Sequence, residues 1–153
     1  MFKRLLVTLL LTFFSTQVTA GVYKDFVPAN VSQIHIEIAD QAEDGCWTNI
    51  GEVKRYTEDK LELFGFNVSR DKFEKYEGRK HYIFSIIINS ARNGGLCYGV
   101  IQIDIQKAIR DNKVIGMFSL GEGSSIFSGQ QNVNQGALKT IGEFMKHVEN
   151  PQW

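Results

Sequence analysis

The sequence predicts an α/β fold: a two-layer sandwich with one four-stranded mixed sheet and both helices on one face of that sheet. Three observations predict it. Apolar and polar residues alternate over 32–39, as in a half-buried strand. Two later segments repeat apolar residues at spacings of three and four, the period of an amphipathic helix. Between those segments lie three apolar runs separated by turn residues, which indicate consecutive strands. The order strand, helix, three strands, helix gives two layers around one core.

The first strand is the alternating segment. Its isoleucines face one way and its polar residues the other, so that Ile34, Ile36 and Ile38 oppose His35 and Glu37. The strand–helix–strand unit that begins here should be a right-handed crossover, which makes its two strands parallel.

The first helix is predicted over 46–64. Asp44 can cap its start, and Asn49 with Glu52 can form a capping box one turn later. Gly65 predicts its end, because the residue after a helix often needs a positive φ. The positions that recur at helical spacing are Trp47, Ile50, Val53, Thr57, Leu61 and Phe64.

Three more strands and a second helix follow. The first of these strands is apolar on both faces, as a central strand is, and a hairpin turn at 92–95 follows it. A second turn is predicted at 111–112, and GEGSSIFSG at 121–129 is predicted as a loop. The last helix runs from Ala137 to Val148, with Pro151 after its end. The strands are predicted over 81–91, 97–109 and 113–120.

The start of the chain has the features of a secretory signal peptide. Lys3 and Arg4 form a positive region, an apolar run follows, and Val18 and Ala20 satisfy the small-residue rule before the cleavage site. The apolar run is too short for a membrane anchor, which needs roughly 20 apolar residues. The predicted organisation is a signal peptide at 1–20, an N-terminal arm at 21–30 and a single α/β domain at 31–153.

The charge balance argues against nucleic acid as a partner. The chain has 17 basic and 17 acidic residues, and loss of Lys3 and Arg4 with the signal peptide leaves a slight acidic excess. Nucleic-acid binding instead needs a basic stripe. Export predicts a periplasmic or secreted location, with no stable membrane insertion after signal cleavage.

The order of elements resembles that of a group of bacterial envelope domains. A helix is followed by Gly65 and Phe66, then by Val68, a three-strand meander and a helix. Curli-secretion lipoproteins, LPS-assembly lipoproteins and the N-terminal domain of the Tol translocation protein are similar, over roughly Val31 to Val148. The resemblance implies a function exerted through surfaces, with no catalytic residues to carry over. The chain departs from many of these proteins because no lipid-bearing cysteine follows the cleavage site, so the resemblance does not imply outer-membrane anchoring.

Cys46 and Cys97 are the two cysteines of the chain, and we expect them to form a disulfide. In the predicted topology the loop into the first helix and the start of the strand at 97–109 meet at one edge of the sheet. A structural zinc site usually needs four ligands, and neither CxxC nor HxxxH spacing occurs. A redox pair would favour CxxC. The sequence therefore predicts a structural bridge and no metal site.

No residue pattern indicates a catalytic centre or a cofactor. His35, His81 and His147 are spread over a strand, a strand start and a helix. Sequence distance leaves a catalytic triad or a metal site open, but nothing pairs these histidines with a positioned nucleophile. Solvated or capping histidines are favoured, and the prediction is a protein that is not an enzyme.

The sheet face away from the helices is the predicted contact surface for a protein partner or a second copy. Tight turns would place large apolar residues there, where a solvated face carries polar ones. These residues are Ile83, Ile87, Tyr98, Val100, Ile115 and Met117. The alternative is that the chain itself covers this face, through Tyr23, Phe26 and Val27 of the N-terminal arm or through Trp153.

Together these features favour a small exported, disulfide-linked, non-enzymatic module that binds another envelope or secreted protein. The alternative is a secreted inhibitor or immunity protein that blocks an enzyme active site, with 121–129 as its protruding loop. An enzyme with an unfamiliar site is a third class, and it would need a deep pocket with perturbed titratable groups.

Overall fold

The computed structural model describes residues 26–70, 81–111 and 114–149, and within these ranges the side chains of 108–115 are not described. The predicted signal peptide and residues 21–25 of the predicted N-terminal arm lie outside the described residues. The same holds for Asn112 in the predicted second turn, for the side chain of Ile115, and for Trp153.

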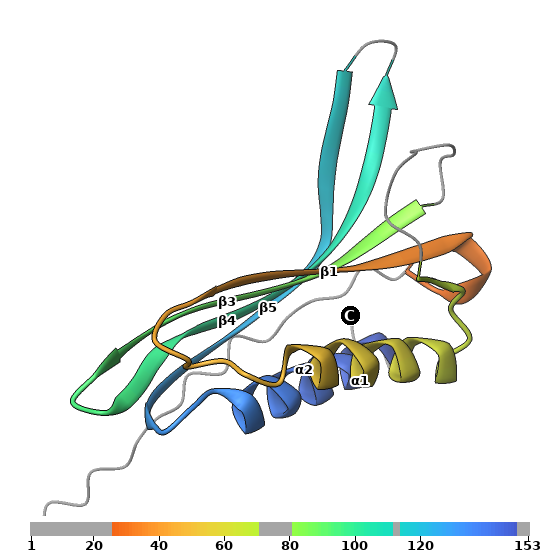
Figure 1. The fold of residues 1–153 in the computed structure, drawn as a ribbon. Helices are drawn as coiled ribbons and strands as arrows, with labels where there is room; N and C mark the ends of the chain where they lie inside the picture. The colour runs from red at the N-terminus through yellow and green to blue at the C-terminus, as the bar shows by residue number, and fades with distance from the viewer. Residues whose placement is uncertain (1–25, 71–80, 112–113, 150–153) are drawn as a thin grey trace, which may run out of the picture.

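Five strands and two helices form two layers, with both helices on one face of a mixed sheet (Figure 1). The strand order is β2-β1-β3-β4-β5. Helix α1 contacts β1 and β2, whereas α2 contacts β4 and β5. The predicted α/β class and mixed sheet are confirmed. The elements are the short 3-10 helix η1 (Pro28–Asn30), β1 (Gln33–Ala42), α1 (Ile50–Leu63), β2 (Val68–Ser69), β3 (His81–Asn93), β4 (Leu96–Asp111), β5 (Val114–Gln130) and α2 (Asn134–Glu149).

The prediction of four strands was wrong by one. The additional strand is β2, which pairs in parallel with β1 through Ile34 opposite Val68 and His35 opposite Ser69. A strand of two residues is too short to show an alternating pattern, so sequence periodicity had no means of indicating it.

The predicted loop at 121–129 was also wrong, because these residues continue β5 as far as Gln130. Glycine and serine favour turns in isolation, but pairing with β4 overrides that preference. On the helix-covered face, Gly121, Gly123 and Ser125 lie opposite three isoleucines of β4, namely Ile105, Ile103 and Ile101.

The predicted parallel crossover and hairpin are both present. β1 runs parallel to β3, from Gln33 opposite His81 to Ala42 opposite Ser90. β3 and β4 are joined by a two-residue turn at Gly94 and Gly95, whose φ values are 59° and 82°. Glycine adopts positive φ without strain, so this turn sets the register of the two central strands.

Helix α1 begins at Ile50, four residues later than predicted. The preceding segment is a loop in which Asp44 has a φ of 54°, so the predicted cap at Asp44 was wrong. Asn49 is the N-cap residue, but its side chain makes no capping hydrogen bond to the backbone. It instead accepts a hydrogen bond from Trp47 Nε1 at 2.9 Å and donates one to Glu52 Oε2 at 3.0 Å.

The end of α1 follows the prediction. Gly65 has a φ of 89°. Its N–H donates to the carbonyl oxygen of Glu62, and the N–H of Phe66 donates to the carbonyl oxygen of Leu61. These two bonds define a Schellman motif, in which the residue at the position of Gly65 adopts the left-handed conformation. Gly65 therefore both ends the helix and turns the chain toward β2.

Gly65→Ala should lower the free energy of unfolding by about 1 kcal/mol, because a Cβ is strained at positive φ. Gly51→Ala is the matched control. Gly51 lies within α1 with nothing within 4 Å of the added Cβ, so the same substitution should raise the free energy of unfolding by up to about 1 kcal/mol. Urea denaturation would measure both, and changes of the same sign would contradict the role given to Gly65.

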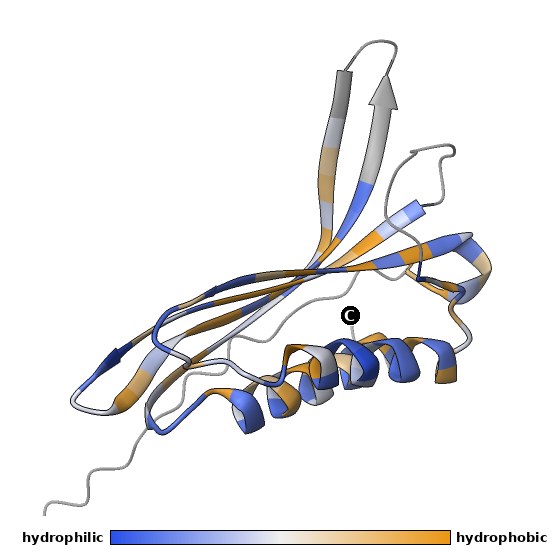
Figure 2. Cartoon of the chain, in the orientation of Figure 1, coloured by the Kyte–Doolittle hydropathy of each residue, from blue (hydrophilic) through white to orange (hydrophobic). Residues whose placement is uncertain are grey.

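The core lies between the helices and the sheet, and apolar and polar segments alternate along the strands that border it (Figure 2). Phe84 of β3 meets Phe144 of α2 edge to face, with ring centroids 5.7 Å apart. Beyond this contact, Phe26 stacks on Phe66 at 4.7 Å and meets Tyr82 at 5.7 Å. Since Tyr82 and Phe84 point to the same side of β3, Phe26 packs on the helix-covered side of the sheet and not on the opposite face.

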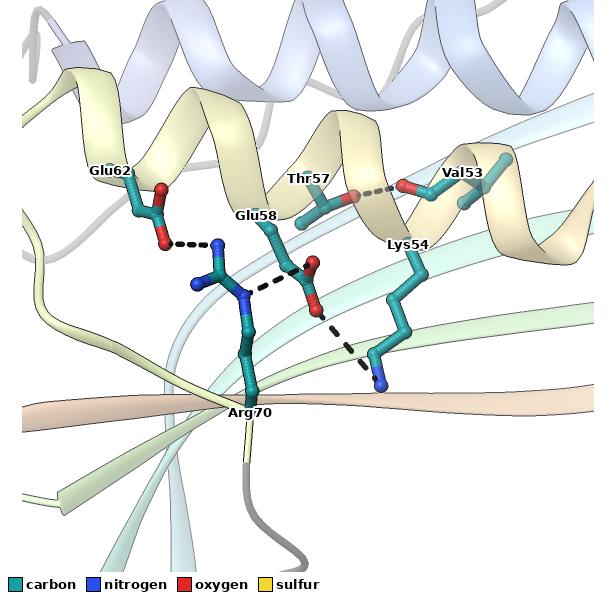
Figure 3. Close-up of polar contacts among 6 residues, drawn as sticks. All are labelled: Val53, Lys54, Thr57, Glu58, Glu62 and Arg70. Atoms are coloured by element: carbon teal, nitrogen blue, oxygen red, sulfur yellow. Dashed lines mark hydrogen bonds and ion pairs between the residues drawn. The ribbon is translucent and has the colours of Figure 1, made fainter.

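An ion-pair cluster ties the chain after β2 to α1 (Figure 3). Arg70 Nη2 lies 2.8 Å from Glu62 Oε1, and Arg70 Nε lies 3.9 Å from Glu58 Oε2. Lys54 Nζ lies 4.0 Å from the other oxygen of Glu58. The basic side chains of the cluster are exposed, and ion pairs at exposed groups contribute at most about 1 kcal/mol each, so the cluster adds only modestly to the stability of the fold.

Candidate interaction surface

The sheet face opposite the helices, here called the outer face, carries side chains in rows that cross four strands. Residues paired across neighbouring strands point to the same face. The rows, taken toward the β3–β4 hairpin, are His35, Ile83, Gln106 and Ser119; then Glu37, Ser85, Asp104 and Glu122; then Ala39, Ile87, Gln102 and Ser124; and finally Gln41, Asn89, Val100 and Ile126.

The middle of the outer face is polar and acidic. Asp104 lies directly opposite Glu122, an arrangement that like-charge repulsion disfavours. Asp104 accepts hydrogen bonds from Ser119 Oγ and from Gln106 Nε2, each at 2.6 Å. Hydrogen bonds to an ionised carboxylate are strong and offset the repulsion. This part of the face is therefore stable when solvated.

At the hairpin end of the outer face, the part formed by β4 and β5 is apolar. We call Leu96, Tyr98, Val100 and Ile126 the hairpin patch. Val100 and Ile126 are direct cross-strand neighbours, and Tyr98, two residues before Val100, points to the same side of β4. Ile126 is 80% exposed, Tyr98 47% and Leu96 44%. Contiguous apolar patches on a protein surface commonly mark interaction sites, whereas single exposed apolar residues are normal.

The structure brings together some of the predicted contact residues and separates others. Tyr98 and Val100 lie side by side in the hairpin patch. Ile87 is half-buried between Ala39 and Gln102, whereas Ile83 is only 3% exposed, so the inclusion of Ile83 in an exposed surface was wrong. Burial removes it from contact with a partner.

The two predicted contact residues of β5 lie away from the hairpin patch. Met117 is exposed, but it pairs with Ala108 on the part of the β4–β5 hairpin that extends past the helices (Figure 1). The polar rows separate it from Tyr98. The backbone of Ile115 lies opposite Arg110 in the same extension.

Sequence reasoning missed two residues of the hairpin patch, Leu96 and Ile126. Ile126, the more exposed of the two, fell within the segment interpreted as a loop. The same correction removes the protruding loop proposed for an enzyme inhibitor, since 121–129 is a paired strand. The adjacent apolar pair Ile126 and Phe127 was the available signal. Within a strand the two residues must point to opposite faces, and the structure has Phe127 buried and Ile126 exposed.

The predicted disulfide is present at the base of the hairpin patch. Cys46 and Cys97 are bonded with their Cα atoms 5.8 Å apart, and both are fully buried. The backbone carbonyl of Cys46 also accepts a hydrogen bond from the N–H of Val133 at 2.8 Å. The bridge thus joins the loop before α1, the start of β4 and the segment before α2.

Two polar side chains connect the loops at the same end of the molecule through hydrogen bonds. Arg92 donates hydrogen bonds to the carbonyl oxygens of Asp44, Gly95 and Gln131 at 3.1, 2.8 and 3.2 Å. Asn134 Oδ1 accepts from the N–H of Thr48 at 3.0 Å, and Asn134 Nδ2 donates to Thr48 Oγ1 at 2.8 Å. Three loops are therefore fixed to one another, and the hairpin patch sits on a rigid support.

The structure also brings two histidines together, which sequence distance had left open. The rings of His35 and His81 lie on neighbouring strands with centroids 6.3 Å apart. Within 26–70, 81–111 and 114–149, no group of three or more His, Cys, Asp or Glu side chains is arranged to hold a metal ion. The histidine pair therefore does not by itself define a metal site.

Among the described helices, none combines the length and the apolar character that crossing a bilayer requires.

Comparisons with known proteins identify similar folds at low sequence identity. No protein-family model and no curated protein matches the chain. The fold is similar to that of the PelC dodecamer from Paraburkholderia phytofirmans, with a TM-score of 0.52 and 10% identity over 88% of this chain and 97% of that chain. A variant of that dodecamer gives a TM-score of 0.49 at 10% identity, over 87% of this chain and 96% of the other. A minor lipoprotein from Acinetobacter baumannii gives 0.32 at 15% identity, over 76% and 88%. The first likeness supports the fold described above.

Proposed function

We propose that the protein is an exported, non-enzymatic module of the cell envelope that binds another protein, either an envelope component or a second copy, through the hairpin patch. The observation that carries the proposal is the exposure of Ile126 and Tyr98, which both neighbour Val100 on the outer face, next to the Cys46–Cys97 disulfide. A rigid apolar patch binds with little loss of conformational entropy, because its side chains are held in place before the partner arrives.

Other features support the location and the mode of action. A signal peptide at 1–20 and a disulfide both fit an oxidising compartment outside the cytoplasm. The similar fold of PelC occurs in a protein that forms a dodecamer, which supports action through protein contacts. The element order that resembles curli-secretion and LPS-assembly lipoproteins supports the same class of function.

Tyr98→Asp and Ile126→Asp should each reduce partner capture from a detergent extract of the host envelope at least tenfold, since each places a charge in the apolar contact. The full chain, processed by its host and then immobilised, would serve as bait. Leu63→Asp is the matched control, because Leu63 is 74% exposed but lies on α1 in the other layer. Its capture should stay unchanged.

Circular dichroism should be the same for all three variants and the melting temperature should change little, because each replaced side chain is exposed. Capture that survives both patch substitutions, or that is lost equally with Leu63→Asp, would refute the hairpin patch as the binding surface.

A further inference from the structure

We infer that residues 121–127 of β5 pair in antiparallel fashion with the same segment of a second copy, forming a symmetric dimer. The inference goes beyond the proposed function, because it assigns the second copy to the β5 edge and leaves the hairpin patch to a different envelope protein. It concerns the backbone edge of β5, whereas the hairpin patch acts through side chains of β4 and β5.

The first argument is that the edge of β5 lacks the side chains that commonly protect an edge strand. β5 is the last strand in the sheet order, so one side of its backbone has no strand beside it in the described part of the chain. In natural β-sheets, lysine, proline or inward-pointing charged residues commonly prevent an exposed edge strand from pairing with another chain. The sequence of β5 contains no lysine, arginine or proline, and Glu122 is its single charged residue. Such an edge is a template for an added strand.

The opposite edge of the sheet is protected. β2 covers β1 at Ile34 and His35. Further along β1, Asp40 Oδ1 accepts the backbone N–H of Ala42 at 3.0 Å, which satisfies a donor that a new strand would otherwise use. When β5 of one copy pairs with β5 of another, the result is a closed two-fold dimer. If β5 of one copy paired instead with β1 of the next, copies could add without limit.

Two irregularities define the segment of β5 that can pair. The β4–β5 register shifts between Cys97 and Gly99 and again between Ile105 and Gln106, which leaves extra residues on β5 at each shift. Between them, 121–127 lies in unbroken register with 99–105. Bulges twist an edge away from a flat partner, so the seven regular residues are the ones available, and Ser124 is at their centre.

Charge then selects the register. A two-fold axis at Glu122 would place the two Glu122 carboxylates directly opposite each other, which is destabilising. An axis at Ser124 places Ser124 opposite the partner's Ser124 and Glu122 opposite the partner's Ile126. The two Glu122 side chains are then roughly 14 Å apart along the strands. That exceeds the Debye length of about 8 Å at physiological ionic strength, so their repulsion is screened.

The size of the contact predicts its strength. Seven paired residues span about 24 Å, and the highly exposed Ile126 lies beside the joint. A stable interface buries about 800 Å² on each partner, more than one short strand pair supplies. The dimer should therefore form at high protein concentration and dissociate on dilution.

Site-specific cross-linking tests the pairing and its register. Processed Ser124→Cys protein, oxidised with copper phenanthroline, should give a disulfide-linked dimer on a non-reducing gel. Ser128→Cys on the same strand is the matched control and should give at least tenfold less, since its two copies would be roughly 27 Å apart. A mixture of Glu122→Cys and Ile126→Cys proteins should cross-link to each other, and neither should cross-link alone.

Sedimentation equilibrium completes the test. The unmodified protein should be dimeric at several hundred micromolar, and Ser124→Lys should weaken the dimer at least tenfold with an unchanged melting temperature. A monomer at that concentration, or equal cross-linking through Ser124→Cys and Ser128→Cys, would overturn the inference. Tyr98→Asp should leave sedimentation unchanged. Loss of the β5 dimer and loss of partner capture can thus be observed separately.

Discussion

Cys97→Ala should lower the free energy of unfolding by about 4 kcal/mol, the value that the chain-entropy account gives for a bridge between residues 51 apart in sequence. The bond constrains the unfolded chain, and in the folded state it joins the loop before α1 to β4. Urea denaturation of the oxidised variant and the unmodified protein would measure the difference. For a domain of this size the loss approaches half of a typical total stability.

The matched controls are Cys46→Ala and the double variant. All three remove the same bond, so their losses should agree within about 1 kcal/mol, and the double variant should not show the sum of the single effects. Reduction of the unmodified protein with dithiothreitol should reproduce the loss. Additive effects would mean that the two side chains stabilise the fold mainly by separate packing, and the role assigned to the bridge would be wrong.

Gly99→Ala should lower the free energy of unfolding by about 3 kcal/mol. A Cβ at Gly99 would overlap the backbone carbonyl oxygen of Asn89 and approach the Cα of Ser90 to 2.7 Å. Backbone atoms cannot rotate away, so β3 and β4 would have to separate beside the disulfide. Thermal unfolding would report a correspondingly lower melting temperature.

Gly116→Ala provides the comparison for Gly99. Gly116 also lies in a strand, but nothing is within 4 Å of the Cβ that alanine adds. Its effect should stay within about 0.5 kcal/mol. Similar losses at both positions would attribute the effect of Gly99→Ala to general strand propensity and not to the close approach of β3.

Much of the fold could be predicted because local signals and tertiary structure agree. The alternation of Ile34, Ile36 and Ile38 is the pattern of a strand with one covered face, and Gly65 ends α1 with the positive φ that its position requires. The disulfide could be predicted from the combination of the expected compartment, the number of cysteines and the predicted topology.

Other features depend on contacts that a sequence does not display. β2 is a strand only because it pairs with β1, and the Gly- and Ser-rich half of β5 is extended only because it pairs with β4. Arg92 reaches three carbonyl groups on separate loops, which no spacing indicates. For the same reason, only part of the hairpin patch could be predicted. Tyr98 and Val100 lay in a recognisable strand, whereas Ile126 did not.

The disulfide also limits how far the chain can be extended. The bridge spans a sequence separation of 51 residues, a stretch that contains α1, β2 and β3. A force applied to the two chain ends would leave that loop unextended, hiding roughly 170 Å of contour length. A narrow translocation pore or an unfolding motor would have to pass two segments of the chain side by side instead of one. Passage through such a pore would therefore have to precede the joining of Cys46 and Cys97, because the joined chain cannot be threaded through it as a single segment.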